Sequence, residues 1–475
     1  MKFGGTSMGT ADRIRASAAL AAGPTKERPV VIVVSAMSKV TDLLLDCFRK
    51  AEERDQEGLQ KNLDALRERH LECCRELLPD NRHEKICAGL NRLIDEFARM
   101  ARGMLMLGEC PPKSKDEAIS IGERLSTYLI AQYMDSVGTP AIDVNAWDVI
   151  ATDAVFGNAT PLMEPTTERA ANLLQPLLDK GVLPVVTGFN ATTLDGRPTT
   201  LGRGGSDFSA SILAAALNAA ELWIWTDVDG ILSADPRLVP DARVLREVTY
   251  AEAAELAYAG AKVLHPRTLA PLAERQIPVW SKNSFAPEKP GTRIVPEIHV
   301  HVGPHAVTSM KDIAMVSIET ASPALSATKV IARTTGVLAQ SGVDVLAITS
   351  SSYRQSFCFV VKQSELDEAL EHLNDAFDIE LAHGYLKPLD VDKEVGLVSV
   401  VGEGMRGTPG LAGRIFTAIS RQSVNIIAIA QGSSELTIAI VVRRSGVEKA
   451  VQAIHAECEL GKQPEWTLEE HQPRA

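Results

Sequence analysis

Short apolar runs alternate with amphipathic stretches through the first half of the chain. The runs Val30–Val34, Leu183–Thr187 and Leu222–Thr226 have the length and composition of buried strands in a parallel sheet. Residues Leu59–Arg75 and Leu90–Leu107 instead carry apolar side chains at helical spacing, with charged positions between them. This alternation predicts a mostly parallel sheet with helices on both faces. Ligands of such a sheet bind at the carboxyl ends of its strands.

The last third of the chain contains one pattern twice. Residues 315–361 and 397–442 both read as strand, loop, helix, strand, turn and strand, and a polar helix follows each copy, at 364–377 and 445–455. A repeat of this length indicates two copies of a small domain rather than a solenoid. The paired strands inside each copy predict an antiparallel sheet with helices on one face.

A proline-rich segment separates these halves. Residues 285–304 contain four prolines and several polar turns, which is typical of a domain junction. At 475 residues the chain also exceeds the roughly 250–300 residues at which a single core stops growing. We therefore predict an N-terminal α/β domain over 1–292, a linker over 293–310, and the two repeat copies over 311–390 and 391–475.

Composition narrows the classes of function. The net charge of −12 argues against a nucleic-acid partner, which would need a basic face. No apolar run reaches 18 residues, so no membrane span is expected, and the N-terminus lacks the apolar segment of a signal peptide. The seven cysteines form no C-x-x-C pair, and we expect reduced thiols in a cytoplasmic protein.

Two glycine-rich segments are candidates for anion binding. Lys2–Ser7 reads KFGGTS, where adjacent glycines let backbone N–H groups approach an anion and the lysine can meet phosphate charge. Thr200–Asp207 reads TLGRGGSD between a strand and a helix. Its Ser206 or Asp207 can cap that helix, whose N-terminus favours an anion, and Arg203 suits a carboxylate. Taken alone, the first segment is more often an ordinary turn.

A third candidate is the acidic turn Thr226–Gly230, which reads TDVDG and directly follows an apolar strand. Nucleotides bind at such strand ends, although a purely structural turn fits nearly as well. The chain has no G-x-x-x-x-G-K-[ST] and no H-R-D or D-F-G set, so it is neither a P-loop enzyme nor a protein kinase.

Together these segments form an ordered set with others along the chain. The set is KFGGTS at 2–7, VSAMSKVT at 34–41, GERLS at 122–126, TTLGRGGSD at 199–207, WTDVDGI at 225–231, ADPR at 234–237 and GAKVLHP at 260–266. It closely resembles the aspartate kinases of the amino-acid kinase superfamily. The C-terminal repeat resembles the paired ACT domains of that family, so the resemblance covers essentially the whole chain.

The resemblance implies an N-terminal αβα sandwich with a mostly parallel sheet, followed by a tandem of α+β, ferredoxin-like ACT domains. It implies transfer of the γ-phosphoryl group of ATP to the β-carboxylate of L-aspartate, the first step toward lysine, threonine, methionine and isoleucine. Feedback by threonine or lysine at the ACT region is expected. The acceptor carboxylate is already ionised at neutral pH, so catalysis should depend on positioning and charge neutralisation rather than on a general base.

Site residues follow from the matched motifs. Lys2 would stabilise the transferring phosphoryl group, and Asp207 would orient Lys2. Arg203 would bind the α-carboxylate of aspartate and Glu123 its ammonium, with Thr41 and Ser206 completing the pocket. The nucleotide site would comprise Gly4, Gly5, Ser7, Thr226, Asp227, Leu232, Arg237, Lys262 and Val263. Mg²⁺ would arrive with ATP, held by phosphates and water, and the effector would be bound by Asn425 and Gln431.

Some positions depart from the family pattern. Lys2 follows Met1 directly, where the family has a few strand residues, and Leu232 stands where an aromatic residue is common. In the first ACT copy, Ser350 and Arg354 align with the Gln and Glu of the segment QGSSE at 431–435. We therefore do not expect the first copy to bind threonine in the usual way. Regulation could use the second copy alone, use another ligand, or be absent.

Two motifs are interpreted as coincidental. Gly402–Gly407 matches G-x-G-x-x-G, but the repeat explains it as an ACT loop rather than a dinucleotide site. His299, His301 and His305 near the junction are interpreted as a solvated linker rather than a metal site.

Two alternative functions stay open. One is phosphorylation of another acceptor, such as glutamate, and the other is an amino-acid-binding regulator with an inactive kinase half. If this chain is complete, a bifunctional kinase–dehydrogenase is not expected, because nothing follows the second repeat. Exposed ACT sheet edges predict at least a homodimer.

Overall fold

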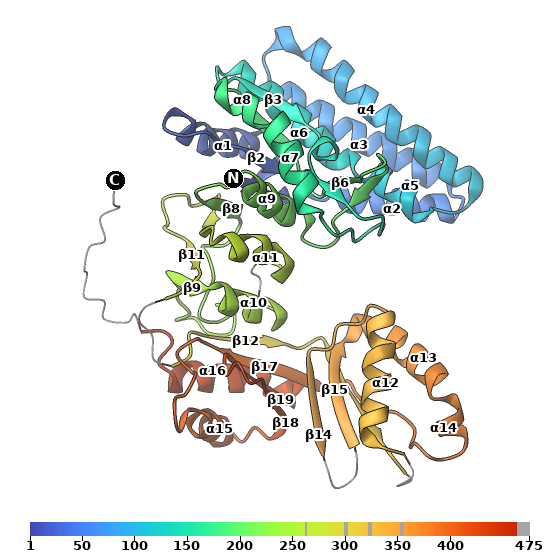
Figure 1. The fold of residues 1–475 in the computed structure, drawn as a ribbon. Helices are drawn as coiled ribbons and strands as arrows, with labels where there is room; N and C mark the ends of the chain where they lie inside the picture. The colour runs from blue at the N-terminus through green and yellow to red at the C-terminus, as the bar shows by residue number, and fades with distance from the viewer. Residues whose placement is uncertain (262–263, 299–302, 322–324, 352–355, 463–475) are drawn as a thin grey trace. The chain divides into compact units, whose positions relative to one another are not determined.

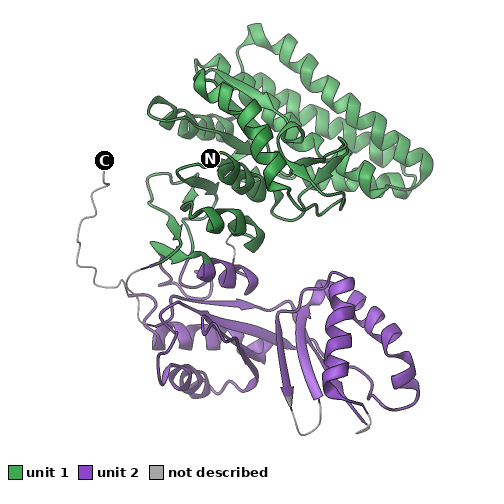
Figure 2. Ribbon diagram, in the orientation of Figure 1, with its two compact units in different colours: residues 1–231, 246–250, 264–297 green, residues 232–245, 251–263, 298–475 purple. Residues whose placement is uncertain are grey.

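The computed structural model describes residues 1–261, 264–298, 303–321, 325–351 and 356–462. The chain forms two compact units, coloured separately in Figure 2. The first comprises 1–231, 246–250 and 264–297, and the second comprises the remainder. Segments 232–245 and 251–263 thus belong to the second unit, although they lie within the predicted N-terminal domain.

An eight-stranded sheet forms the centre of the first unit (Figure 1). In spatial order its strands are β3 (Ala141–Val144), β5 (Leu183–Thr187), β2 (Ile32–Val34), β1 (Lys2–Phe3), β8 (Leu222–Thr226), β10 (Val279–Asn283), β11 (Thr292–Val295) and β9 (Glu247–Thr249). The first six are parallel, and β11 is antiparallel to β10. The predicted parallel sheet is confirmed, and its central strands are short and almost wholly buried.

Helices cover both faces of this sheet. One face packs against a layer comprising α1 (Ala11–Ala22), α2 (Val40–Glu52), α3 (Gln56–Leu77), α4 (Asp80–Leu107), α5 (Pro112–Ile119) and α6 (Ile121–Ser136). Near the other face lie α7 (Met163–Leu173), α8 (Gln175–Asp179), α9 (Gly205–Ala216) and α11 (Pro266–Arg275), with α9 between α7 and α11. A small sheet of β4 (Ala151–Thr152), β6 (Asn190–Thr193) and β7 (Pro198–Thr200) leads into α9.

The second unit contains two antiparallel four-stranded sheets. One has the order β14 (Ala347–Ser351), β15 (Ser356–Lys362), β13 (Ile313–Glu319) and β16 (Asp390–Asp392), and it packs on α12 (Ala327–Gln340) and α13 (Leu366–Ala376). The other has the order β12 (Ala306–Met310), β17 (Val395–Val401), β19 (Thr437–Arg443) and β18 (Ile426–Gln431), and it packs on α15 (Leu411–Arg421) and α16 (Val447–Glu457).

Each copy therefore has the predicted strands and helices, but the sheets are completed by segments from elsewhere. β12 lies within the predicted linker and pairs with β17 of the second copy. The first copy is thus inserted between two strands of the second. The short helix α14 (Asp378–Ala382) follows α13, and all but the first residue of α10 (Tyr250–Tyr258) belong to this unit.

Two local predictions were wrong. The helix after TLGRGG is capped by Gly204, which adopts a left-handed φ of 70°, and no side chain caps it. Ser206 and Asp207 lie inside its first turn, where Asp207 pairs with Lys2 instead. His305 is buried rather than solvated, with its Nδ1 2.7 Å from Glu252 Oε1; His299 and His301 lie outside the described residues.

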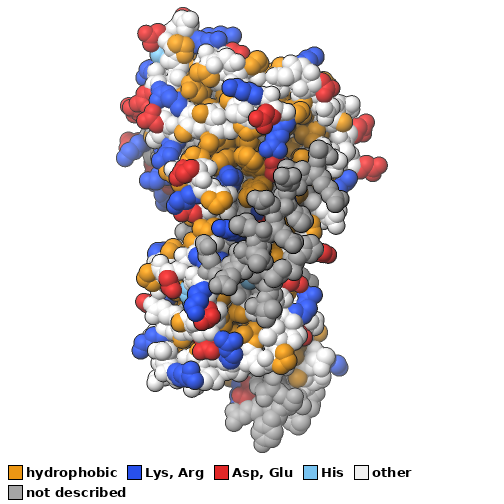
Figure 3. All heavy atoms as spheres, turned by 90° about the vertical axis from the view of Figure 1, so that its left-hand side faces the viewer, with side chains coloured by type: hydrophobic (Ala, Val, Ile, Leu, Met, Phe, Trp, Pro, Cys, Tyr) orange, Lys and Arg blue, Asp and Glu red, His pale blue; other side chains and the backbone are white. Residues whose placement is uncertain are grey.

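The surface charges, the hydropathy of the helices and the state of the cysteines can be compared with the sequence-based expectations. Acidic and basic side chains are interspersed on the face drawn in Figure 3, so neither sign of charge dominates the coloured part of that face. Among the described helices, none has both the length and the hydropathy to span a membrane. All seven cysteines are free thiols.

Candidate active site

Four turns meet at the carboxyl edge of the central sheet in the first unit. The turn after β1 is joined to β8 by a hydrogen bond from Gly4 N–H to the Trp225 carbonyl at 3.3 Å. The loop after β5 is joined to β2 by a hydrogen bond from Gly188 N–H to the Val34 carbonyl at 2.8 Å. Because these strands are parallel, segments that are far apart in the sequence deliver their turns to one edge.

Lys2 and Asp207 form the charged centre of this edge. Lys2 Nζ lies 2.6 Å from Asp207 Oδ1, and Lys2 as a whole is only 8% exposed. A Cβ at Gly4 would lie 3.4 Å from this ammonium, so a larger residue there would crowd the lysine. The structure thus brings together the two predicted catalytic residues, with a glycine leaving space beside them.

Glu123 lies behind the same edge, in the first turn of α6. It is 5% exposed and accepts a hydrogen bond from Ala36 N–H at 3.2 Å. Burial raises the pKa of the Glu123 carboxyl to about 8, and the hydrogen bond from Ala36 offsets part of that rise. Burial therefore favours the neutral form of this carboxyl, and a cation beside it would favour the ionised form.

Arg203 and Ser206 lie at the amino end of α9. The Arg203 side chain is exposed, and it makes no ion pair with any described residue. Ser206 abuts Gly188 so closely that a Cβ on that glycine would lie 2.6 Å from the serine Cβ. Thr41 lies in the first turn of α2, after the loop that holds Ala36, and no hydrogen bond links it to the other predicted pocket residues, all of which are described.

The nucleotide residues predicted in the first unit also lie at this edge. Thr226 ends β8 and Asp227 follows it, exposed, with 3.3 Å between their side-chain oxygens. Ser7 is fully buried in the turn after β1, and its Oγ lies 2.8 Å from Ser284 Oγ. Ser284 also binds the Thr226 carbonyl through its own N–H at 2.9 Å.

Sequence reasoning missed the segment after β10 as part of this edge. Asn283 Nδ2 donates to Asp229 Oδ1 at 2.6 Å, and Lys289 Nζ lies 2.6 Å from Asp229 Oδ2. These two partners, Lys289 first, lower the pKa of Asp229. Because the segment K-N-S-F has no glycine-rich or acidic pattern, only tertiary pairing reveals that it holds the TDVDG turn.

Asp116 was also missed. Although it is buried, its carboxylate accepts hydrogen bonds from Gly157 N–H at 2.7 Å and from Thr200 N–H and Oγ1–H at 2.9 and 3.0 Å. Thr200 begins the TLGRGGSD segment. A lone aspartate in a short amphipathic helix gives no sequence signal for this bracing role.

Other predicted residues belong to the second unit. Arg237 is exposed and paired with Asp235 at 2.6 Å, and Leu232 pairs with Val244 in an isolated bridge. Lys262 and Val263 lie outside the described residues, as does Arg354 of the first ACT copy. The nucleotide roles of these residues stay predictions.

The predicted effector residues lie at the two ends of β18. Asn425 directly precedes the strand and Gln431 ends it, both exposed. Six residue steps of a strand span about 20 Å, which is longer than one small amino acid. Within one chain, a bound amino acid could therefore contact only one of them. The loop beside Gln431 is held by a 2.6 Å hydrogen bond from Gly407 N–H to Glu435.

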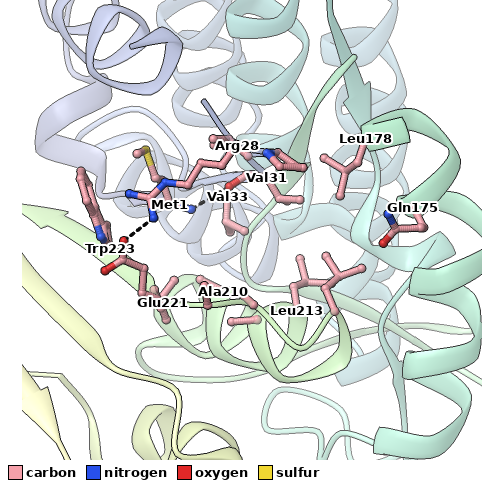
Figure 4. Close-up of a pocket in the computed structure, with 17 residues that line it drawn as sticks. Met1, Arg28, Val31, Val33, Gln175, Leu178, Ala210, Leu213, Glu221 and Trp223 are labelled. Atoms are coloured by element: carbon pink, nitrogen blue, oxygen red, sulfur yellow. Dashed lines mark hydrogen bonds and ion pairs between the residues drawn. The ribbon is translucent and has the colours of Figure 1, made fainter. Parts of the chain in front are cut away.

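A cavity of about 260 Å³ lies at the opposite end of the central strands (Figure 4). Apolar side chains line it, with the Arg28–Glu221 ion pair at 2.6 Å beside Trp223. Its position at the amino ends of β2 and β8 separates it from the candidate site at the carboxyl ends.

The described residues offer no group of three His, Cys, Asp or Glu side chains suited to a metal ion.

Comparison with known proteins identifies the family. The amino acid kinase family model matches residues 1–283, and an ACT domain model matches 325–377 and 398–458. The chain belongs to the amino acid kinase family. Within it the chain is an aspartate-kinase relative: aspartokinase 1 of Arabidopsis thaliana chloroplasts is 31% identical over 471 residues, which are 96% of this chain and 79% of that protein.

Longer relatives match as well. The bifunctional aspartokinase/homoserine dehydrogenase 1 of A. thaliana is 34% identical over 97% of this chain, but the chain spans only 51% of that protein's length. Among solved structures, aspartokinase III of E. coli in complex with aspartate and ADP has a TM-score of 0.81 at 29% identity, covering 96% of this chain and 98% of that one. Aspartate kinase of Clostridium acetobutylicum has a TM-score of 0.76 at 26% identity, covering 96% and 99%.

Proposed function

We propose that this amino acid kinase transfers the γ-phosphoryl group of ATP to the β-carboxylate of L-aspartate, forming 4-phospho-L-aspartate and ADP. The observation that carries the proposal is the Lys2–Asp207 pair at 2.6 Å, placed where β1 and α9 meet at the carboxyl edge of the sheet. The similarity to E. coli aspartokinase III, whose structure holds aspartate and ADP, supports this choice of substrates.

Aspartate would be held by two opposite charges. The exposed Arg203 presents a planar fork that suits the α-carboxylate. Glu123 would pair with the ammonium, which would stabilise the ionised form of a carboxyl whose pKa burial raises to about 8. Thr41 and Ser206 would complete the pocket and leave the β-carboxylate directed toward Lys2.

Phosphoryl transfer would then rest on charge neutralisation. Lys2 would bind the transferring group, with Asp207 fixing its ammonium, and Gly4 and Gly5 would supply backbone N–H donors. The amino end of α9 adds the positive end of a helix dipole. Bound Mg²⁺ supplies further neutralisation of the phosphate charge. Ser7 would help to hold the phosphates, and Thr226 and Asp227 would hold the rest of the nucleotide.

The ACT tandem would make the enzyme responsive to an amino acid, either threonine or lysine. The product would enter the biosynthesis of lysine, threonine, methionine and isoleucine in the cytoplasm. Aspartokinase III of E. coli has also been solved with lysine and aspartate, which supports an amino-acid effector here. We propose that the effector binds Asn425 of one copy of the protein and Gln431 of a neighbouring copy, each residue lying at an end of its own β18.

The test is formation of an acyl phosphate, trapped as its hydroxamate. Mg-ATP would be supplied with L-aspartate, L-glutamate or no acceptor, each with and without threonine and lysine. Product is expected with L-aspartate but not with L-glutamate. Either threonine or lysine should inhibit its formation. Product with glutamate would favour another acceptor, and no product with any acceptor would favour a non-catalytic regulatory protein.

A further inference from the structure

A buried pair of serine hydroxyls spans the end of β8. Ser7 Oγ and Ser284 Oγ are 2.8 Å apart, and the two residues are 0% and 6% exposed. Ser7 follows β1 and Ser284 follows β10, whereas β8 lies between these two strands in the sheet. The pair therefore joins turns that are not neighbours, and it crosses over the last residue of the strand between them.

The direction of the hydrogen bond between the two serines follows from the single proton that each hydroxyl can donate. Ser284 Oγ also lies 3.1 Å from the Thr226 carbonyl, which can only accept. With its single proton given to that carbonyl, Ser284 must accept from Ser7. Ser17 Oγ–H in turn donates to the Ser7 carbonyl at 3.0 Å. This chain of bonds runs from α1 through the turn after β1 to the end of β8.

The two ends of this series of hydrogen bonds lie in different parts of the proposed nucleotide site. Ser7 belongs to the glycine-rich turn that would hold phosphates, and Thr226 begins the turn that would hold the rest of the nucleotide. The distance between the two turns must match the length of one bound molecule. Asn283 and Lys289 hold Asp229 in the second turn, so the whole segment after β10 is tied to that turn.

We propose that Ser284 is a positioning residue of the nucleotide site, which sets the phosphate turn against the turn after β8. This inference rests on the proposed function, because it takes both turns to bind one nucleotide. Ser284 itself need not contact the nucleotide. Removal of its hydroxyl should leave the buried Ser7 hydroxyl without its acceptor, and only the Ser284 N–H would still bind the Thr226 carbonyl. The two turns could then move apart.

The test is nucleotide binding by Ser284→Ala. Titration calorimetry with ADP should show a dissociation constant raised about fivefold to thirtyfold, which is the effect of one buried hydrogen bond. The KM for ATP should rise by a similar factor, while the KM for aspartate stays within twofold. Ser284→Cys, which keeps a donor that is weaker and slightly larger than the hydroxyl, should lie between Ser284→Ala and the wild type. It also carries the test if the alanine variant fails to fold.

A matched control is Ser211→Ala in α9, since Ser211 is equally buried and its hydroxyl has no partner among the described residues. Its ADP affinity should equal that of the wild type. In a double-mutant cycle, Ser7→Ala should weaken ADP binding less in the Ser284→Ala background than alone.

An ADP dissociation constant within twofold of wild type in Ser284→Ala would overturn the proposal, as would equal rises of the KM for ATP and the KM for aspartate. ADP binding does not require aspartate to be phosphorylated. If the wild type binds ADP but makes no product, weakened binding by Ser284→Ala still supports the positioning role, and only the assigned reaction fails.

Discussion

At the scale of single residues, the candidate site depends on charges that burial makes costly to leave unpaired. Lys2 is buried beside Asp207, so removing either partner would leave a charge in a poorly hydrated place. For Glu123, burial raises the pKa to about 8, which favours the neutral form and lowers the cost of leaving the carboxyl unpaired. The Lys2–Asp207 pair should therefore affect the rate of the reaction, whereas Glu123 should affect its dependence on pH.

The Lys2–Asp207 pair should control the rate of phosphoryl transfer. Asp207→Asn keeps the size of the side chain but no longer fixes the ammonium of Lys2, and we expect kcat to fall about 100-fold to 1000-fold with little change in the KM for aspartate. Lys2→Met should fall at least as far, and the double variant should add little, because the two act as one unit.

Steady-state kinetics would measure these effects, with Asp135→Asn as the control. Asp135 pairs with Arg82 at 2.8 Å on the surface of the first unit, and an exposed pair contributes little. Full kcat in Asp207→Asn would contradict the assignment.

Glu123 should make aspartate binding depend on pH. In the free protein its pKa of about 8 means that the carboxyl must lose a proton before it pairs with an ammonium. As pH falls from 8 to 6, aspartate binding should therefore weaken by up to about tenfold per unit, and it should level off above pH 8. Calorimetric titration with aspartate between pH 6 and 9 would measure this.

Glu123→Gln is the matched variant, since its amide cannot titrate. It should bind aspartate more weakly than the wild type at pH 8, with an affinity that changes little between pH 6 and 8. A wild-type affinity that is constant over the same range would show that Glu123 is already ionised in the free protein or does not meet the ammonium.

At the scale of elements, the site depends on how closely turns approach one another. Gly188 N–H binds the Val34 carbonyl, and the same glycine abuts Ser206 at the amino end of α9. Gly204 supplies the left-handed φ that starts this helix without a side-chain cap. Glycines thus set the position of α9, and through it the positions of Arg203 and Asp207.

A methyl group at position 188 should displace α9. In Gly188→Ala the new Cβ would lie 2.6 Å from Ser206 Cβ, so either the helix or the loop must move. We expect a loss of about 1–3 kcal/mol of folding free energy and a raised KM for aspartate.

Gly103→Ala in α4 is the control, because nothing lies within 4 Å of its Cβ position and alanine favours a helix by up to about 1 kcal/mol. Denaturant unfolding and aspartate kinetics would compare the two variants. An unchanged KM in Gly188→Ala would show that the position of α9 tolerates this shift.

At the scale of the whole molecule, the second unit has sheet edges that can pair with another copy. β14 and β18 are edge strands of their sheets, and within this unit they contact each other. They carry Ile348 and Ile429, which are 42% and 41% exposed, a high exposure for isoleucine on a strand. Exposed apolar side chains on an edge strand favour association with another copy.

We therefore expect at least a dimer in sedimentation at micromolar concentration. Ile429→Lys should shift the protein toward a monomer, because it places a charge on the edge. Ile379→Lys on α14, where the isoleucine is 62% exposed, should leave the assembly unchanged. A wild-type monomer at this concentration would refute the association, and with it the idea that one effector lies between two copies of β18.

Elements marked by local patterns could be predicted directly. The runs at 183–187 and 222–226 are strands with those bounds, and both ACT copies have the predicted order of strands and helices. Lys2 and Asp207 were paired through family motifs, and the structure places them in contact. Each of these features depends on a short stretch of sequence, either through side-chain periodicity or through a compact motif.

Other features required the tertiary structure, because they join residues whose separation carries no local pattern. Ser7 and Ser284 are 277 residues apart, and neither lies in a sequence that marks it as a partner for the other. β12 lies in the segment that the sequence predicted as a linker, and only its pairing with β17 makes it part of the second ACT sheet. The sequence by itself predicted which turns would carry the chemistry of this protein, because each of those turns is a compact motif. Long-range packing decided the pKa of Glu123, the place of β12 and the hydroxyl bridge over β8, since burial and strand pairing depend on the whole fold.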